Sequence, residues 1–349
     1  MKLKKSIVQS IKAITDVTEL RCYLQNAVEL EHATIPTYLT ALLSIKQGEN
    51  KQASQIIRSV VIEEMLHMSI ACNVLNAIGG SPAINTKAFV PTFPGPLPMG
   101  VGEDRGLIVT LAPLSKDQLL NVFMAIEEPD DLLTCPELAN IIAEELDIYT
   151  TIGEFYQAII DKIIELGDDI FTGDRARQMV NHRWFPENVL WAVTNVETAV
   201  AALELIVLQG EGSGCSPLDP ENQLAHYYRF AEIYHGRRLV KDPSADMGWS
   251  YTGEPIPLNE AGIYNLIENA KAADYEPDSV GRRYADQTNY TYSSLLNNLH
   301  QTFNGKPELI DQAMGVMYEF RLSVQKMVTL KLKCGSHAAP PFQYVALNR

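Results

Sequence analysis

The sequence predicts an all-α protein, a four-helix bundle with additional C-terminal helices and a long loop rich in proline and glycine. Long segments repeat apolar residues at spacings of three and four, the period of a helix with one buried face. Glycine or proline follows most of these segments, as is typical of helix ends. The expected helices cover residues 17–47, 50–78, 136–166, 187–209, 220–240, 291–303 and 307–333.

The first two expected helices should form an antiparallel hairpin. Asp16 or Thr18 is suited to cap the start of the first helix, and Gly48 ends it. The second helix stops at the run GGSP, residues 79–82, which is a strong C-terminal signal. Only a few polar residues separate the two helices, and so short a connection joins antiparallel neighbours.

A segment rich in proline and glycine follows this pair. Its run GLIVTLAPL, residues 106–114, predicts one short strand. Residues 89–106 form a candidate lid, because long loops in compact domains are usually functional. Residues 241–290 are polar, and no regular structure is predicted for them. We expect a metal-binding bundle over residues 15–240 and a helical extension packed on it over residues 241–349.

Composition and charge restrict the class of protein. The 349 residues, 46% hydrophobic and 20% charged, indicate a globular chain. A net charge of -15 argues against nucleic acid and anionic membranes as partners, since both attract basic surfaces. No apolar run reaches the roughly 18 residues of a membrane span, and the N-terminus lacks the apolar core of a signal peptide. Five scattered cysteines without a CxxC pair favour reduced, buried thiols in a cytoplasmic protein.

The segment EEMLHMSIACNVLNAIGG, residues 63–80, places two polar residues where a helix should be apolar. Steps of four and three keep Glu64 and His67 on the buried face, whereas Glu63 falls on the other side and is expected to be solvated. The stripe consists of Ala53, Ile57, Val60, Glu64, His67, Ala71, Val74 and Ile78.

Residues 17–47 carry a matching stripe. Its members are Leu20, Leu24, Ala27, Glu31, Thr34, Tyr38, Leu42 and Ile45. Glu31 therefore points inward, at about the same depth from the turn as Glu64, while Glu29 and His32 lie on the wetter side. A buried, ionised carboxylate is costly unless it is paired or coordinated, so the two carboxylates indicate a metal site.

The helix expected over residues 187–209 is apolar almost all round, so it should be buried on several sides. Glu197 and Glu204 are then polar exceptions that require partners. Glu154 lies at the edge of the apolar stripe of its own helix, at a depth comparable with that of Glu197. These residues are candidate ligands from the third and fourth helices.

The helix expected over residues 220–240 holds a second Glu-x-x-His pair, Glu232 and His235. His226 shares a stripe with Phe230 and is the substitute imidazole if this helix packs the other way. Di-iron bundles take one Glu from each of two helices and a Glu-x-x-His pair from each of two more. The predicted metal ligands are Glu31, Glu64, His67, Glu154, Glu197, Glu232 and His235, with His226 and Glu204 in reserve.

Each polar residue also has a simpler interpretation. Glu204 could pair with Arg183 or Arg229, and Glu232 with His235 could form the solvated side of their helix. Tyr38 and Tyr156 are more often core residues than redox partners. Oxygen and nitrogen ligands suit iron, manganese and zinc, so the metal and its number, one or two ions, remain open. Whether residues 187–209 or 220–240 complete the site also remains open.

Several segments carry a resemblance to a known family. They are ELEHATIPTYLTALLSI, EEMLHMSIACNVLNAIGGSP, TIGEFYQAI, LIVLQGEGSG, HYYRFAEI and the closing YSSLLNNLHQTFNGKPELIDQAMGVMYEF. Together they resemble the ferritin-like domain family found in iminophenylpyruvate dimer synthases of violacein- and rebeccamycin-type pathways. The resemblance covers most of residues 15 to 335.

This resemblance implies a ferritin-like bundle with iron and an oxidative role in secondary metabolism. The implied activity is an iron-dependent oxidoreductase that activates dioxygen or peroxide to oxidise or couple a small substrate bearing an imine or amine. One alternative is a non-catalytic ferritin-fold protein for metal storage or scaffolding. Another is a metal-free enzyme whose buried glutamates act as acid and base. The oligomeric state, a homo-oligomer included, is open.

Overall fold

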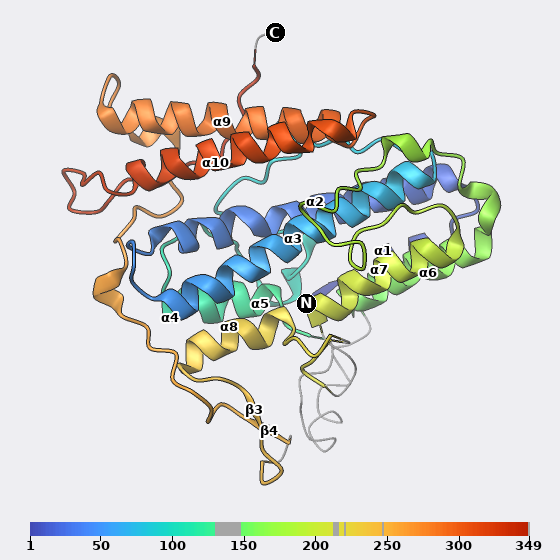
Figure 1. Cartoon of the computed structure of the whole chain (residues 1–349), viewed down its shortest axis with the longest axis horizontal. Helices are drawn as coiled ribbons and strands as arrows, with labels where there is room; N and C mark the ends of the chain where they lie inside the picture. Colours follow the sequence, from blue (N-terminus) through green and yellow to red (C-terminus); the bar gives the residue numbers. More distant parts are fainter. Residues whose placement is uncertain (130–147, 212–215, 220, 246–247, 348–349) are drawn as a thin grey trace.

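The computed structural model describes residues 1–129, 148–211, 216–219, 221–245 and 248–347 (Figure 1). The described chain is mostly helical and has only two small antiparallel sheets of two strands each. In the first sheet β1 (Lys2–Lys4) pairs with β2 (Tyr149–Thr151), and in the second β3 (Val240–Lys241) pairs with β4 (Trp249–Ser250). The predicted all-α class is confirmed.

Two long helices, α2 (Val17–Ser44) and α3 (Lys51–Ala77), form the predicted antiparallel hairpin and run the length of the bundle (Figure 1). The Asp16 side chain accepts a hydrogen bond from the backbone N–H of Thr18, 2.6 Å away, which begins α2. Beyond the end of α3, Gly79 adopts a positive φ of 78°. This glycine stop allows the chain to turn away from the bundle.

The rest of the bundle consists of shorter helices that cover opposite ends of this hairpin. On one end lie α6 (Ile152–Leu166) and α7 (Val196–Glu211), with α1 (Lys5–Lys12) packed on α6 (Figure 1). On the other end lie α8 (His226–His235) and a helical segment made of α4 (Lys116–Gln118), a π-helical stretch (Leu119–Phe123) and α5 (Met124–Ile126). The middle of the hairpin therefore faces the ends of several short helices.

Several elements differ from the sequence-based prediction. Residues 149–151 form a strand rather than helix, and residues 136–147 lie outside the described residues. The helix expected from residue 187 begins at Val196, because a proline and a series of turns precede it. The segment over residues 116–126 was not predicted at all. The expected strand over residues 106–114 is reduced to one bridge between Val109 and Gly95.

The C-terminal residues add a second helical hairpin, α9 (Val280–Thr302) and α10 (Ile310–Met327), on the opposite face of the α2–α3 pair (Figure 1). A hydrogen bond of 2.8 Å joins the Tyr292 hydroxyl to Nε2 of His32 in α2. The Asn76 side chain donates to the Phe303 carbonyl oxygen, 2.7 Å away. The extension thus packs on the bundle, and its division into a separate domain stays a prediction.

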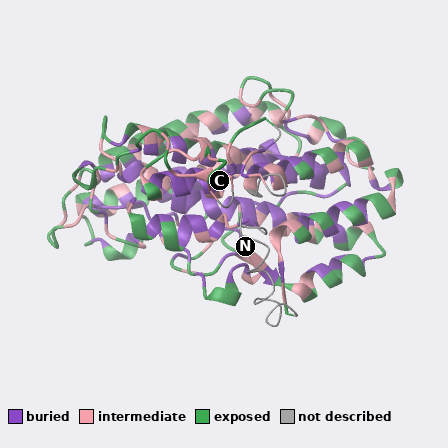
Figure 2. Cartoon of the chain, turned by 90° about the horizontal axis from the view of Figure 1, so that it is seen from below, coloured by how far each residue is buried: buried purple, intermediate pink, exposed green. Residues whose placement is uncertain are grey.

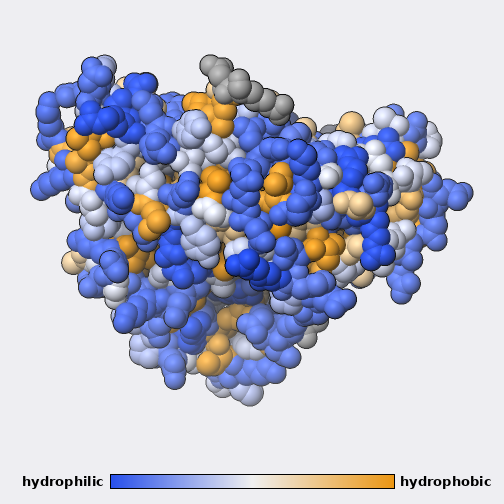
Figure 3. Space-filling model, turned by 45° about the horizontal axis from the view of Figure 1, so that its top comes forward, coloured by the Kyte–Doolittle hydropathy of each residue, from blue (hydrophilic) through white to orange (hydrophobic). Residues whose placement is uncertain are grey.

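Buried residues gather along the facing sides of the central helices (Figure 2). They form one large hydrophobic cluster, with a small second cluster around Tyr275 and Met327. On the face shown in Figure 3 the surface is mostly hydrophilic, with apolar groups in separate small patches. No described helix is long and apolar enough to cross a membrane. Cys72 is buried as predicted, but Cys22 and Cys334 are exposed, so that expectation is wrong for them.

Candidate metal centre

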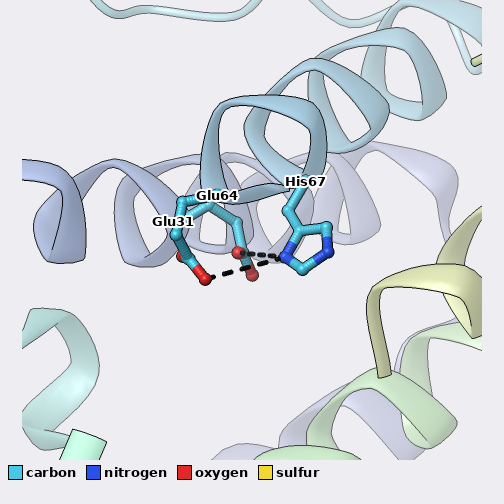
Figure 4. A group of neighbouring side chains, drawn as sticks. All are labelled: Glu31, Glu64 and His67. Carbon is cyan, nitrogen blue, oxygen red and sulfur yellow. Dashed lines mark ion pairs between the residues drawn. The ribbon is translucent and has the colours of Figure 1, made fainter. Parts of the chain in front are cut away.

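Glu31, Glu64 and His67 lie together near the middle of the α2–α3 hairpin and point toward one another (Figure 4). All three are buried, with 7%, 3% and 2% of their surfaces exposed. The Nδ1 atom of His67 lies 3.4 Å from Glu31 Oε2 and 3.9 Å from Glu64 Oε1. The inward orientation that helix periodicity predicts is confirmed for these three side chains.

A second group of side chains shares Glu64 with the first. His226 Nδ1 lies 2.9 Å from Glu64 Oε1 and 3.5 Å from Glu127 Oε2. In each group, Glu31–Glu64–His67 and Glu64–Glu127–His226, the ligand atoms lie within 4.8 Å of one another. One carboxylate is thus positioned between two clusters, each of which offers a further carboxylate and an imidazole. This is the arrangement expected when one glutamate bridges two cations.

The residues that surround the hairpin in this region come from the ends of short helices. Glu127 follows the last residue of α5, and His226 is the first residue of α8. Tyr156 lies near the start of α6, and Gln209 lies in the last turn of α7. A π-helical stretch precedes α5, and such stretches turn the following side chains about the helix axis and often occur at functional sites.

Hydroxyl groups orient the three carboxylates. The Thr34 hydroxyl lies 2.8 Å from Glu64 Oε2 and donates a hydrogen bond to it. Tyr156 donates to Glu31, and Tyr38 donates to Glu127. Burial, together with the nearby carboxylates, raises the pKa of both tyrosines well above the ordinary value, so both phenols stay protonated and act as donors.

The two histidines are oriented in the same way by different partners. Nε2 of His67 lies 2.9 Å from the amide oxygen of Gln209, and Nε2 of His226 lies 2.9 Å from a Glu63 carboxylate oxygen. Both partner oxygens only accept hydrogen bonds, so each Nε2 carries a proton. In the neutral rings the Nδ1 lone pairs then point at the carboxylates, as metal-ligating imidazoles require.

The charges of the site favour a bound cation. The ion-pair partners of Glu31, Glu64 and Glu127 in the described chain are His67 and His226. Burial, and then the charge of Glu127, raises the pKa of Glu64 to about 7. Nδ1 of His226 lies 2.9 Å from Glu64 and 3.5 Å from Glu127, so one imidazole nitrogen faces two carboxylates. Three largely buried carboxylates against two imidazoles fit a centre of one or two divalent metal ions.

Glu63 differs from the prediction, which placed it in solvent. Its side chain is only 21% exposed and lies between His226 and Arg229, whose Nη1 atom is 2.7 Å away. Burial alone would raise its pKa, but His226 and Arg229 together hold the pKa at about 2. Glu63 is therefore a permanent anion beside the second imidazole.

A cavity of about 60 Å³ opens beside the carboxylates. Its polar lining includes Glu31, Glu64, His67, Glu127 and Tyr156. Its apolar lining includes Leu30, Ile126, Ile152, Ile206 and Val207. A water molecule needs about 10–15 Å³, so the cavity has room for several water-sized molecules or a small ligand against the carboxylates.

Three glutamates of the predicted ligand set do not reach this group. Glu154, Glu197 and Glu204 are exposed, so the prediction that Glu197 and Glu204 are buried is wrong, and Glu154, predicted at the edge of its stripe, points away from the group. Glu154 lies in the first turn of α6, where its backbone N–H is capped by the Thr151 hydroxyl, 3.0 Å away. In α7 nearly every face is apolar, and a stripe drawn through such a helix does not identify which side is buried.

Glu232 and His235 also lie apart from the two groups. Glu232 is buried, but its carboxylate accepts hydrogen bonds from Arg238, at 2.5 Å, and from the backbone N–H of Leu239, at 2.9 Å. The His235 ring stacks on Tyr251, with ring centroids 4.2 Å apart. The reserve residue His226 takes the position that the prediction gave to His235, because the opposite face of α8 is turned toward α3.

Glu127 was missed by the sequence-based prediction. It ends a helical segment that was not predicted, because prolines and glycines surround it. The signal that could have found it is the run QLLNVFMAIEE, in which an apolar face of helical period ends at a glutamate.

Comparison with known proteins identifies the class. A family model described as ferritin-like matches residues 24–235, more than half of the chain, and the chain belongs to this family. The crystal structure of a ferritin-like protein from Caulobacter vibrioides is similar, with a TM-score of 0.63 and 23% sequence identity over 95% of this chain and 99% of that one. That similarity shows the fold alone. None of the curated proteins compared with the chain matches it.

Proposed function

We propose that the chain is a di-iron oxidoreductase that activates dioxygen or peroxide to oxidise or couple a small substrate. The position of Glu64 between two clusters of carboxylate and imidazole supports this proposal best. Glu31 and His67 would hold one metal ion, Glu127 and His226 the other, and Glu64 would bridge them. Iron bound here would supply reversible one-electron oxidation and a place for the oxidant.

The protein's own residues perform three tasks in this proposal. Tyr38 and Tyr156 hold the outer carboxylates by hydrogen bonds, so the ligands are positioned before metal binds. The Nε2–H groups of His67 and His226 donate to Gln209 and Glu63, which turns both Nδ1 atoms toward the carboxylates, where they can coordinate a metal ion. The apolar cavity wall limits water near the carboxylates, which strengthens electrostatic interactions inside the cavity.

The substrate class is proposed from the same cavity and from the resemblance to iminophenylpyruvate dimer synthases. An imine or amine N–H could donate to the carboxylates, while an apolar part of the molecule contacts Leu30 or Val207. A small-molecule partner and a cytoplasmic location belong to the proposal as well. The small volume of the cavity also suits an oxidant alone, which favours iron storage as the second candidate function.

Metal analysis followed by oxygen consumption tests the proposal. Protein purified without chelator should contain iron, and the metal-free protein should consume dioxygen when ferrous iron is added. An added aromatic α-imino or α-amino acid should then be turned over. Iron oxidation without substrate turnover would favour storage. A metal content below about 0.1 ion per chain would contradict a centre built for one or two ions and favour metal-free acid–base chemistry.

A further inference from the structure

We infer that the two metal positions are inequivalent: Glu127 and His226 form a tighter, more enclosed position, whereas Glu31 and His67 form an exchangeable position that binds the exogenous ligand. This inference rests on the proposed dinuclear centre. Two differences between the positions carry it, namely the charge of the group behind each imidazole and the access of each position to the cavity.

The first difference is the partner of each histidine. His226 donates its Nε2–H to the anionic carboxylate of Glu63, whereas His67 donates to the neutral amide of Gln209. A charge-assisted hydrogen bond pulls the proton away from the ring more strongly, which makes Nδ1 a better donor to a cation. Arg229 holds Glu63 in place from the far side through a bond of 2.7 Å. The imidazole of His226 should therefore bind its metal more tightly.

The second difference is enclosure. His226 and Tyr38 are 0% exposed and neither lines the cavity, so this position reaches the cavity through Glu127 and the shared Glu64 alone. The Tyr38 ring packs against Phe123 and Phe230, with centroids 4.6 and 5.1 Å away. A metal ion between Glu127 and His226 would thus be covered on its His226 side by aromatic rings and by α8, so its exchange with solvent should be slower than at the other position.

The position between Glu31 and His67 is open by comparison. Both residues line the cavity, together with Tyr156 and with Val207 and Gly210 of α7. A ligand in the cavity meets this position directly. The oxidant or the nitrogen of the substrate should consequently bind on the His67 side of the centre, and a metal ion at this position should be the first to dissociate.

Stepwise metal titration of the full-length, metal-free protein with Mn²⁺ tests this inference. Calorimetry and manganese paramagnetic resonance should resolve two binding steps. We expect Glu63→Gln to weaken the tighter step by about 10–100-fold, the usual effect of losing a partner of a metal-bound histidine, and to leave the weaker step unchanged. Glu63→Asp should restore part of the affinity, because it keeps the charge.

Two further variants complete the design. Gln209→Glu should strengthen the weaker step, since it supplies the charge that this half lacks. Glu204→Gln removes the same charge from the exposed face of α7 and should change neither step. Two equal steps, or an effect of Glu63→Gln on the weaker step alone, would overturn the inference. Binding of less than about 0.1 ion per chain would instead overturn the dinuclear proposal itself.

Ligand access provides a second measurement that does not depend on the Glu63 variants. Azide added to the protein loaded with two Mn²⁺ ions should perturb the resonance signal of the weaker site only. Val207→Phe enlarges a cavity-lining side chain and should weaken azide binding while both metal steps remain. Azide binding at the tighter site, or binding unaffected by Val207→Phe, contradicts the assignment of the open position.

Discussion

Two long, uninterrupted helices supply one half of the centre, whereas the ends of short helical segments supply the other. Glu31 and His67 lie in the middle of α2 and α3, while Glu127 and His226 lie at the end of α5 and the start of α8. Middle positions are fixed by the helical hydrogen bonds on both sides, but terminal positions are not. The second half therefore depends more on tertiary contacts.

Those tertiary contacts come from the same hairpin. Tyr38 of α2 holds Glu127, and Glu63 of α3 holds His226. In return, Tyr156 of α6 and Gln209 of α7 hold the first half. Each half is thus held by its own supporting residues, and the two halves meet at Glu64 and at the stacked rings of His67 and His226, whose centroids lie 5.5 Å apart. The following predictions test that separation.

The largest effect is expected from Glu64→Ala, because this carboxylate belongs to both groups. Both metal-binding steps should weaken by more than about 100-fold, beyond the effect of losing a supporting residue. Elemental analysis after dialysis should find almost no metal. Glu197→Ala serves as the control, since Glu197 is exposed in the first turn of α7. Equal metal content in Glu64→Ala and the parent would disprove the shared position.

His226→Ala should remove one metal ion and leave the other. Nδ1 of His226 faces Glu64 and Glu127, so its loss opens the second group. Glu31 and His67 keep their ligand atoms, and His67 loses only the ring that stacks on it. The metal content per chain should fall by about half, as expected for one of two positions. His235→Ala is the matched control on the same helix. Metal loss in that control instead would revive the sequence-based assignment of His235.

Tyr38→Phe and Tyr156→Phe should each weaken a different step. Each variant removes one hydrogen bond to a carboxylate and leaves the ring in place. We expect about 10-fold weaker binding at the half that loses its hydroxyl, and a loss of about 1.5–3 kcal/mol in unfolding free energy without metal. Stepwise Mn²⁺ titration and urea denaturation measure the two effects. The same step responding to both variants would show that the halves are not separate.

The same contrast explains what the sequence could predict. Helix periodicity places Glu31, Glu64 and His67 correctly, because α2 and α3 are long enough for a stripe to define one buried face. It fails for Glu197 and Glu204, because α7 is apolar on nearly every side.

The other residues depend on tertiary structure. Glu127 and His226 lie where helices end, so few or no helical neighbours on one side define their direction. The length of α8, ten residues, is too short to decide between its two polar faces, and only its packing against α3 selects His226 over His235. The helical hairpin and its three site residues could thus be predicted from the sequence. The residues that the short helices add to the site, Glu127 and His226, could not.

Acidity should affect the metal-free and metal-loaded proteins in opposite ways. Burial raises the folded-state pKa of Glu64 from 4.5 to about 7. For His226, burial lowers the pKa but is outweighed by Glu127, Glu63 and Glu64, so the pKa lies well above 6.5. A pKa raised by folding means that the folded state binds the proton more tightly, so this stabilisation is full below the unfolded pKa and is lost as the pH rises through the folded pKa.

The melting temperature of the metal-free protein should therefore fall between about pH 5 and pH 8, by about 2–4 °C for each kcal/mol lost. The pKa of Glu63 is lowered from 4.5 to about 2, so this residue stabilises the fold more as the pH rises, but its effect changes with pH only below about 4.5. Metal displaces the protons, so the loaded protein should gain stability over the same range. Differential scanning fluorimetry with and without Mn²⁺ measures both slopes, and parallel slopes would argue against metal at these residues.

The smallest effect is expected from Gly210→Ala, which separates two explanations for an open position. Gly210 lies beside Gln209 in the last turns of α7, and among the described residues beyond its own helix backbone and chain neighbours a methyl group there meets no atom within 4 Å. The change should raise the unfolding free energy by about 0.5–1 kcal/mol, since glycine is costly in a helix. If the neutral amide of Gln209 is what weakens the position at His67, the weaker Mn²⁺ step stays unchanged. If instead a flexible end of α7 weakens the position at His67, the Gly210→Ala variant should bind Mn²⁺ more tightly at the weaker step. That result would show that the charge difference between the halves is not the cause.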